Sequence, residues 1–152
     1  MNPLPSAAPI LLIGLMFILA GCAPKNTAPT FDASSVPTKA SRRVTLKEVE
    51  PIFSTKCAAC HNPMGMDEGV AVGGLVLVHG SAAANLVNAK STESKLLRVH
   101  PGDLAKSYIY HKLNGTFAAV GGTGLKMPLG GTLPPEEISL INDWILSGAP
   151  LE

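Results

Sequence analysis

The residues Cys57-Ala58-Ala59-Cys60-His61 constrain this chain more than any other stretch of its sequence. Two thiols separated by two residues and followed directly by a histidine form the C-x-x-C-H pattern, which is typical of the covalent attachment of c-type haem. The spacing lets both thiols reach the vinyl groups on one edge of a porphyrin, and it places the imidazole beneath the iron. The sequence therefore predicts one covalently attached haem c, held by Cys57 and Cys60, with His61 as an iron ligand.

Two other uses of paired cysteines fit the rest of the chain less well. A thioredoxin-like redox pair lies next to a βαβ unit, and the sequence has no such pattern. A structural zinc site needs a second pair of ligands. The chain holds only three cysteines and no H-x-x-x-H pair, so haem attachment is the favoured interpretation.

The N-terminal segment has the form of an export signal. No charged side chain precedes Lys25, and residues 10–20 form an apolar run that is too short for a bilayer core needing about 20 residues. The run ends in Leu19-Ala20-Gly21-Cys22, which resembles the lipobox of bacterial lipoprotein precursors. This resemblance implies a signal peptide over residues 1–21, a lipid on Cys22, and a membrane-anchored protein of the cell envelope that faces the periplasm.

The remaining chain divides into a linker and one domain. Residues 22–42 are rich in Pro, Ser, Thr and Ala without apolar periodicity, which predicts a flexible tether. Residues 43–152 then form the folded domain. With a lipid on Cys22 and haem on the other two cysteines, no thiol is left for a disulfide.

Haem bound through one histidine has a sixth coordination position, for which Met127 is the best candidate. It precedes Pro128 in a glycine-rich loop ahead of the last predicted helix, and a methionine in such a loop is the usual distal ligand of cytochromes c. His100 is the strongest rival. Met64 and Met66 are weaker candidates because they are too close to His61 in sequence. His79 and His111 are weaker because they are expected to be surface or hydrogen-bonded core histidines.

Several stretches together resemble the planctomycete-type cytochrome c domain family, from about Val44 to Pro150. They are Asn85-Leu86-Val87-Asn88, Pro101-Gly102-Asp103, the seven residues from Ser107 to Leu113, Lys126-Met127-Pro128, and the fourteen residues from Glu136 to Ala149. The resemblance implies a mainly α, class I cytochrome c fold with one haem, in which the first and last helices cross beside the cofactor. It maps the haem-binding residues to Cys57, Cys60 and His61, and the methionine ligand to Met127.

Local patterns predict the elements of the domain. Thr45 and Glu48 form a capping box, followed by apolar residues at helical spacing. Further helices are expected over residues 81–88, over residues 103–114 before Gly115, and from the Pro-Pro-Glu-Glu stretch at 134–137 to Gly148. Residues 75–78 and 96–99 have the composition of short strands that could pair as a small two-stranded ribbon.

The charge balance excludes one class of partner. Twelve basic and eleven acidic residues give a net charge of +1, so no electrostatic footprint for nucleic acid exists. We expect the protein to carry single electrons between redox protein partners. We expect no catalytic residues, and therefore no enzyme activity. Two alternatives stay open: a haem-based sensor or peroxidase with a displaceable sixth ligand, and a haem subunit of a larger oxidoreductase.

Overall fold

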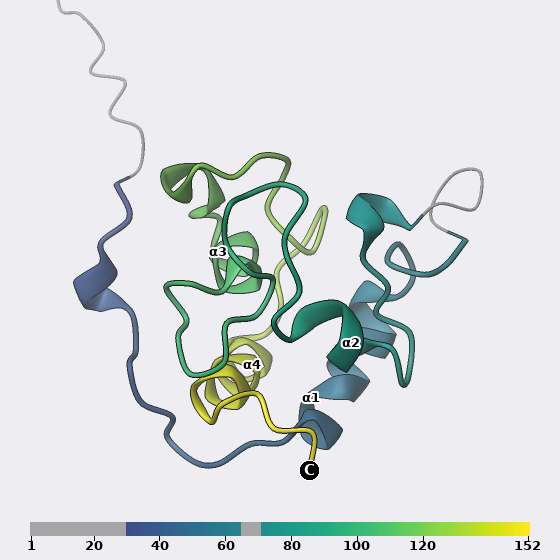
Figure 1. The fold of residues 1–152 in the computed structure, drawn as a ribbon, viewed down its shortest axis with the longest axis horizontal. Helices are drawn as coiled ribbons and strands as arrows, with labels where there is room; N and C mark the ends of the chain where they lie inside the picture. The colour runs from purple at the N-terminus through teal and green to yellow at the C-terminus, as the bar shows by residue number, and fades with distance from the viewer. Residues whose placement is uncertain (1–29, 65–70) are drawn as a thin grey trace, which may run out of the picture.

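The computed structural model describes residues 30–64 and 71–152 (Figure 1). These residues fold mainly into helices with little strand, which confirms the prediction of a mainly α chain. The α-helices are α1 (Leu46–Ile52), α2 (Ala82–Leu86), α3 (Tyr108–Asn114) and α4 (Pro135–Leu146). Shorter helical segments are η1 (Ala33–Ser35), η2 (Phe53–Cys57), η3 (Val72–Gly74) and η4 (Phe117–Val120).

Helix α1 begins at the predicted capping box, because the backbone amide of Thr45 donates to the Glu48 carboxylate at 3.0 Å. The helix then changes character in a way that the sequence pattern does not predict. From Phe53 it continues as the π-helical segment η2, in which the amide of Ala58 donates to the Phe53 carbonyl at 3.0 Å. The wider turn carries the chain into the cysteine pair, and π-helical turns of this kind occur often at functional sites.

Of three predicted helix boundaries, one lies elsewhere in the structure and two are confirmed. The helix expected from Asp103 begins only at Tyr108, because Asp103 instead closes a turn by accepting a hydrogen bond from the Lys106 amide at 3.1 Å. Its predicted end is confirmed, since Gly115 adopts a left-handed conformation with φ of 74° directly after α3. The last helix is confirmed as α4, and it starts at Pro135 as the proline-led first turn predicts.

The predicted ribbon is wrong in its pairing. Residues 75–78 do not pair with 96–99; instead the segment 96–99 lies beside residues 87–91, with the Arg98 amide donating to the Ala89 carbonyl at 2.7 Å. The pairing forms only isolated bridges within the described residues. Residues 75–78 turn toward the cysteine loop, where the amide of Leu77 donates to the carbonyl of His61 at 2.7 Å. The helix expected over residues 81–88 is present as the shorter α2.

Helices α1 and α4 pack against each other near the C-terminus, in the lower part of the view in Figure 1. Phe53 and Trp144 are fully buried there and meet edge to face, with ring centroids 5.8 Å apart. The Trp144 indole donates to the Pro150 carbonyl at 3.0 Å, which ties the C-terminal segment to the core. Because η2 continues directly from α1, this helix pair fixes the position of the cysteine motif.

The second half of the predicted tether lies on the domain. Val36 is only 6% exposed, and Phe31 stacks edge to face on His111 with ring centroids 4.7 Å apart. The amide of Ser41 donates to Asp143 at 2.8 Å. Residues 31–41 therefore contact the domain through a few apolar and polar groups, which the local sequence pattern does not predict.

The predicted signal peptide over residues 1–21 and the lipidation site Cys22 lie outside the described residues. Among the helices that are described, none combines the length and apolar character needed to cross a membrane.

Candidate functional site

A pocket brings together the four predicted haem-binding residues. It lies between α2, α3, the cysteine loop (residues 57–61) and the methionine loop (residues 121–131). Cys57, Cys60, His61 and Met127 all line it, although Met127 is far from the others in sequence. The cavity has a volume of about 240 Å³ and opens to solvent on one side. Most of its wall is apolar and comes from Leu75, Leu77, Leu86, Ile109, Leu113 and Pro128.

The cysteine motif forms a single tight turn at the end of η2. The carbonyl of Cys57 accepts hydrogen bonds from the amides of both Cys60, at 3.2 Å, and His61, at 2.9 Å. Both thiols are free and half-buried at the pocket wall. Burial, with smaller effects of Glu137 and Cys60, raises the pKa of the Cys57 thiol to about 11, so this thiol is neutral at pH 7.

His61 is oriented by a backbone carbonyl. Its Nδ1 lies 3.2 Å from the carbonyl oxygen of Val72, so Nε2 is the nitrogen available to a metal in the pocket. Burial, together with the positive charges of Arg98 and Lys112, lowers the pKa of His61 against the opposing effect of the hydrogen bonds to the Val72 and Leu75 backbone. The imidazole is therefore held neutral and in one tautomer, which is the state that ligates iron.

The segment that carries the Val72 carbonyl is itself anchored by Arg98. The guanidinium donates to the carbonyls of Gly73 and Gly74 through Nη2, at 2.9 and 3.0 Å, and to that of Asn85 through Nη1, at 3.0 Å. Gly73 and Gly74 have φ near 63° and 62°, a conformation that favours glycine. Arg98 thus links the wall beside α2 to the loop that orients His61.

The methionine loop is fastened to α3. The amide of Met127 donates to the carbonyl of Lys112 at 3.0 Å, and the hydroxyl of Tyr108 donates to the carbonyl of Thr123 at 3.0 Å. The side chain of Lys112 also reaches Thr123, at 3.3 Å, and forms an ion pair with Glu93 at 2.8 Å. Two points of the loop are therefore tied to one helix face.

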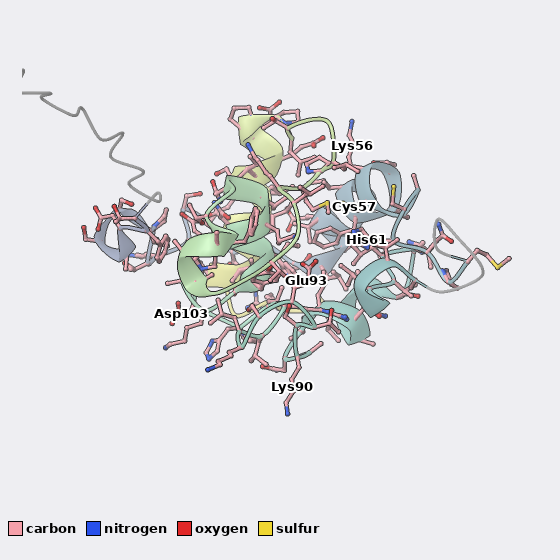
Figure 2. The ribbon with its side chains drawn as sticks, turned by 90° about the horizontal axis from the view of Figure 1, so that it is seen from above. Lys56, Cys57, His61, Lys90, Glu93 and Asp103 are labelled. Carbon is pink, nitrogen blue, oxygen red and sulfur yellow. The ribbon has the colours of Figure 1, made fainter. Side chains whose placement is uncertain are left out.

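Figure 2 shows Cys57, His61 and Glu93 toward the middle of the molecule, whereas Lys90 extends outward from the neighbouring segment. The sequence motifs do not mark Glu93 or Lys112 as site residues. One signal was available for Lys112, because it follows Tyr108 by one helical turn and so shares the pocket face of α3. No local pattern marks Glu93, which reaches the site from an irregular loop.

The structure places none of the described rival ligands at this pocket. His100 lies elsewhere, with Nδ1 at 3.2 Å from the Pro101 carbonyl. Both ring nitrogens of the buried His111 are occupied, by Ala105 and Thr116, each at 2.9 Å. The other two are directed to the surface or are strongly exposed: His79 beside Glu50, and Met64 at 73% exposure. Met66 lies outside the described residues.

The donor set suits a c-type haem. Two adjacent thiols, a neutral imidazole and a thioether face an apolar cavity, and soft sulfur with imidazole is a ligand pair that iron accepts in cytochromes. Comparison of the chain with models of protein families, with curated proteins and with solved structures found no match.

Proposed function

We propose that this chain is a monohaem c-type cytochrome that carries single electrons, with a domain of the class I cytochrome c type related to the planctomycete-type family. The observation that carries the proposal is the meeting of Cys57, Cys60, His61 and Met127 at one apolar pocket. The C-x-x-C-H motif alone indicates attachment. A methionine from a distant loop lines the same pocket, and it would supply the second protein ligand to the iron.

Each of these residues has a separate task. Cys57 and Cys60 would hold one porphyrin edge through thioethers, and their shared turn fixes the spacing of the two residues. His61 presents Nε2 because Val72 occupies Nδ1. Met127 offers a neutral, soft sulfur, and the apolar wall excludes water. Haem iron bound in this way supplies reversible one-electron chemistry, with a potential raised by the His/Met ligand pair.

The polar residues of the pocket favour a carrier over a haem enzyme. Arg98 donates to three backbone carbonyls, and Lys112 pairs with Glu93. These charged groups are thus engaged in holding loops together. A peroxidase requires polar groups aimed at a bound substrate, and the proposed role instead requires a rigid apolar surrounding.

The proposed location follows from Cys22. A lipid on this thiol would anchor the mature chain to a membrane of the cell envelope, facing the periplasm, where it would meet redox protein partners. Replacing Cys22 by Ser should move the protein out of the membrane fraction or leave the precursor uncleaved. A wild-type protein recovered free in the periplasm with a mature terminus other than Cys22 would refute the anchor.

The Met127→Ala variant tests the proposal most sharply. The wild-type ferric protein should be low-spin with a weak sulfur-to-iron charge-transfer band, and the ferrous protein should bind carbon monoxide slowly. The variant should lose the band, bind carbon monoxide readily and have a lower reduction potential. His100→Ala is the matched control, and its spectrum should equal that of the wild type.

The opposite pattern would reject the assignment. If Met127→Ala kept the wild-type spectrum while His100→Ala altered it, His100 would be the ligand. If the wild type itself were high-spin, or took up carbon monoxide at once, a sensor or peroxidase would replace the electron carrier. Co-purification with a stoichiometric partner from native membranes would identify the chain as a subunit of a larger oxidoreductase.

A further inference from the structure

One ion pair in the pocket is not explained by haem attachment. The Nζ of Lys112 lies 2.8 Å from Oε2 of Glu93, and the Lys112 side chain is only 10% exposed. The same ammonium group lies 5.0 Å from the ring centroid of Phe117 and 5.6 Å from that of Tyr108. A lysine is rarely buried to this degree without a partner, so the pair and its two aromatic neighbours form a built arrangement.

The pair joins two separate walls of the pocket. Glu93 belongs to the loop between α2 and α3, whereas Lys112 belongs to α3 itself. Lys112 also contacts the methionine loop twice, through Nζ to the Thr123 carbonyl at 3.3 Å and through its own carbonyl to the Met127 amide at 3.0 Å. A displacement of the loop backbone away from α3 therefore breaks these contacts of Lys112.

The loop closes tightly over the pair. A Cβ atom at Gly124 would lie 2.5 Å from Oε1 of Glu93 and 2.9 Å from Nζ of Lys112. Gly124 also has a φ of 80°, so a larger residue is disfavoured twice. The backbone of the methionine loop thus rests directly on the ion pair, three residues before the proposed ligand.

We infer that Glu93 and Lys112 form a latch that positions Met127, so that the ion pair controls how often the methionine loop opens. This inference rests on the proposed function for the role of Met127, but the latch itself is a property of the polypeptide. Glu93 and Lys112 act together as one ion pair beneath the loop backbone at Gly124, and neither residue is required to touch iron. Both are therefore positioning residues, with Lys112 in direct contact with the loop.

The test compares Lys112→Met, Glu93→Gln and the double variant with the wild type. The conservative Glu93→Gln keeps the shape of the side chain. It therefore still tests the ion pair if Lys112→Met fails to fold. Lys90→Met is the matched control, because it removes one positive charge from an exposed position on the same loop as Glu93. The first readout is amide hydrogen exchange over residues 121–131, which reports loop opening.

We expect exchange in this segment to increase about tenfold in Lys112→Met, the change that one charge-assisted hydrogen bond produces in an equilibrium. Glu93→Gln should give a smaller increase in the same segment, and Lys90→Met should give none. The effect of the double variant should be smaller than the sum of the two single effects, because both substitutions remove the same ion pair. Carbon monoxide uptake by the ferrous protein should increase in the same order.

The latch is overturned if exchange over residues 121–131 in Lys112→Met and Glu93→Gln equals that of Lys90→Met, or if the two changes are additive. Failure of the proposed function gives a different result. If the wild type binds carbon monoxide at once while exchange still increases in Lys112→Met, the latch stands and Met127 is not the iron ligand.

Discussion

Arg98 is the residue whose removal should most affect the histidine side of the pocket. Its guanidinium donates to the carbonyls of Gly73, Gly74 and Asn85 at 2.9 to 3.0 Å. Gly73 retains one further donor, the hydroxyl of Thr92 at 3.1 Å. Replacing Arg98 by Met keeps the apolar stem and deletes all three hydrogen bonds. The carbonyls of Gly74 and Asn85 then have no side-chain donor.

The magnitude follows from the number and exposure of these bonds. A hydrogen bond from a charged donor contributes about 1.5 to 3 kcal/mol when buried, and the partial exposure of Arg98 reduces each to about 1 kcal/mol. The free energy of unfolding should therefore fall by about 2 to 3 kcal/mol. For a domain of this size the melting temperature should fall by about 10 °C.

Denaturant titration followed by circular dichroism measures the change, with an unaltered slope showing that the unfolded state is the same. Arg43→Met is the control, because Arg43 is exposed and donates only weakly to the Glu152 carbonyl at 3.3 Å, so its effect should stay within about 0.5 kcal/mol. Arg98→Lys should recover part of the loss. If Arg98→Met destabilised the domain no more than Arg43→Met, the proposed anchoring of the His61 loop would be wrong.

Three further changes test other parts of the account. Glu48→Ala removes the carboxylate that caps α1, and it should lower the denaturant midpoint in the same titration. Gly122→Ala would place a Cβ atom 2.5 Å from the Tyr108 ring and should lower the melting temperature, whereas Gly131→Ala, which meets open space, should leave it unchanged. Asp143→Ala removes the acceptor for the N-terminal segment and should make residues 31–41 more sensitive to limited proteolysis; equal cleavage rates would show that this segment is not held by Asp143.

The parts of the fold that the sequence predicts are those set by neighbouring residues. The capping box of α1, the proline-led start of α4 and the glycine after α3 each depend on contacts within one turn of helix. The residues Cys57, Cys60 and His61 could likewise be assigned from spacing alone. The loop of Met127 and its place before the last helix predict that it is an iron ligand. The structure places Met127 at the same pocket as Cys57, Cys60 and His61.

The parts that the sequence does not predict depend on distant partners. Residues 96–99 pair with residues 87–91, which directly follow α2 in the chain. The composition of the segments does not predict which two of them pair. The contacts of Arg98 and the pairing of Glu93 with Lys112 join loops whose approach is fixed only by the packed domain. Phe31 and Val36 pack on the domain for the same reason, although their surroundings in sequence are typical of a linker.

The central claim is that Cys57 and Cys60 bind haem covalently. The most direct measurement is mass spectrometry of the purified wild-type protein, expressed in cells that can attach haem, after digestion to a peptide containing residues 57–61. We predict that this peptide carries the mass of one haem after denaturation, and that Cys57→Ala combined with Cys60→Ala abolishes the addition. A wild-type peptide at the mass of two free thiols, from a protein that folds and is exported, would contradict the account.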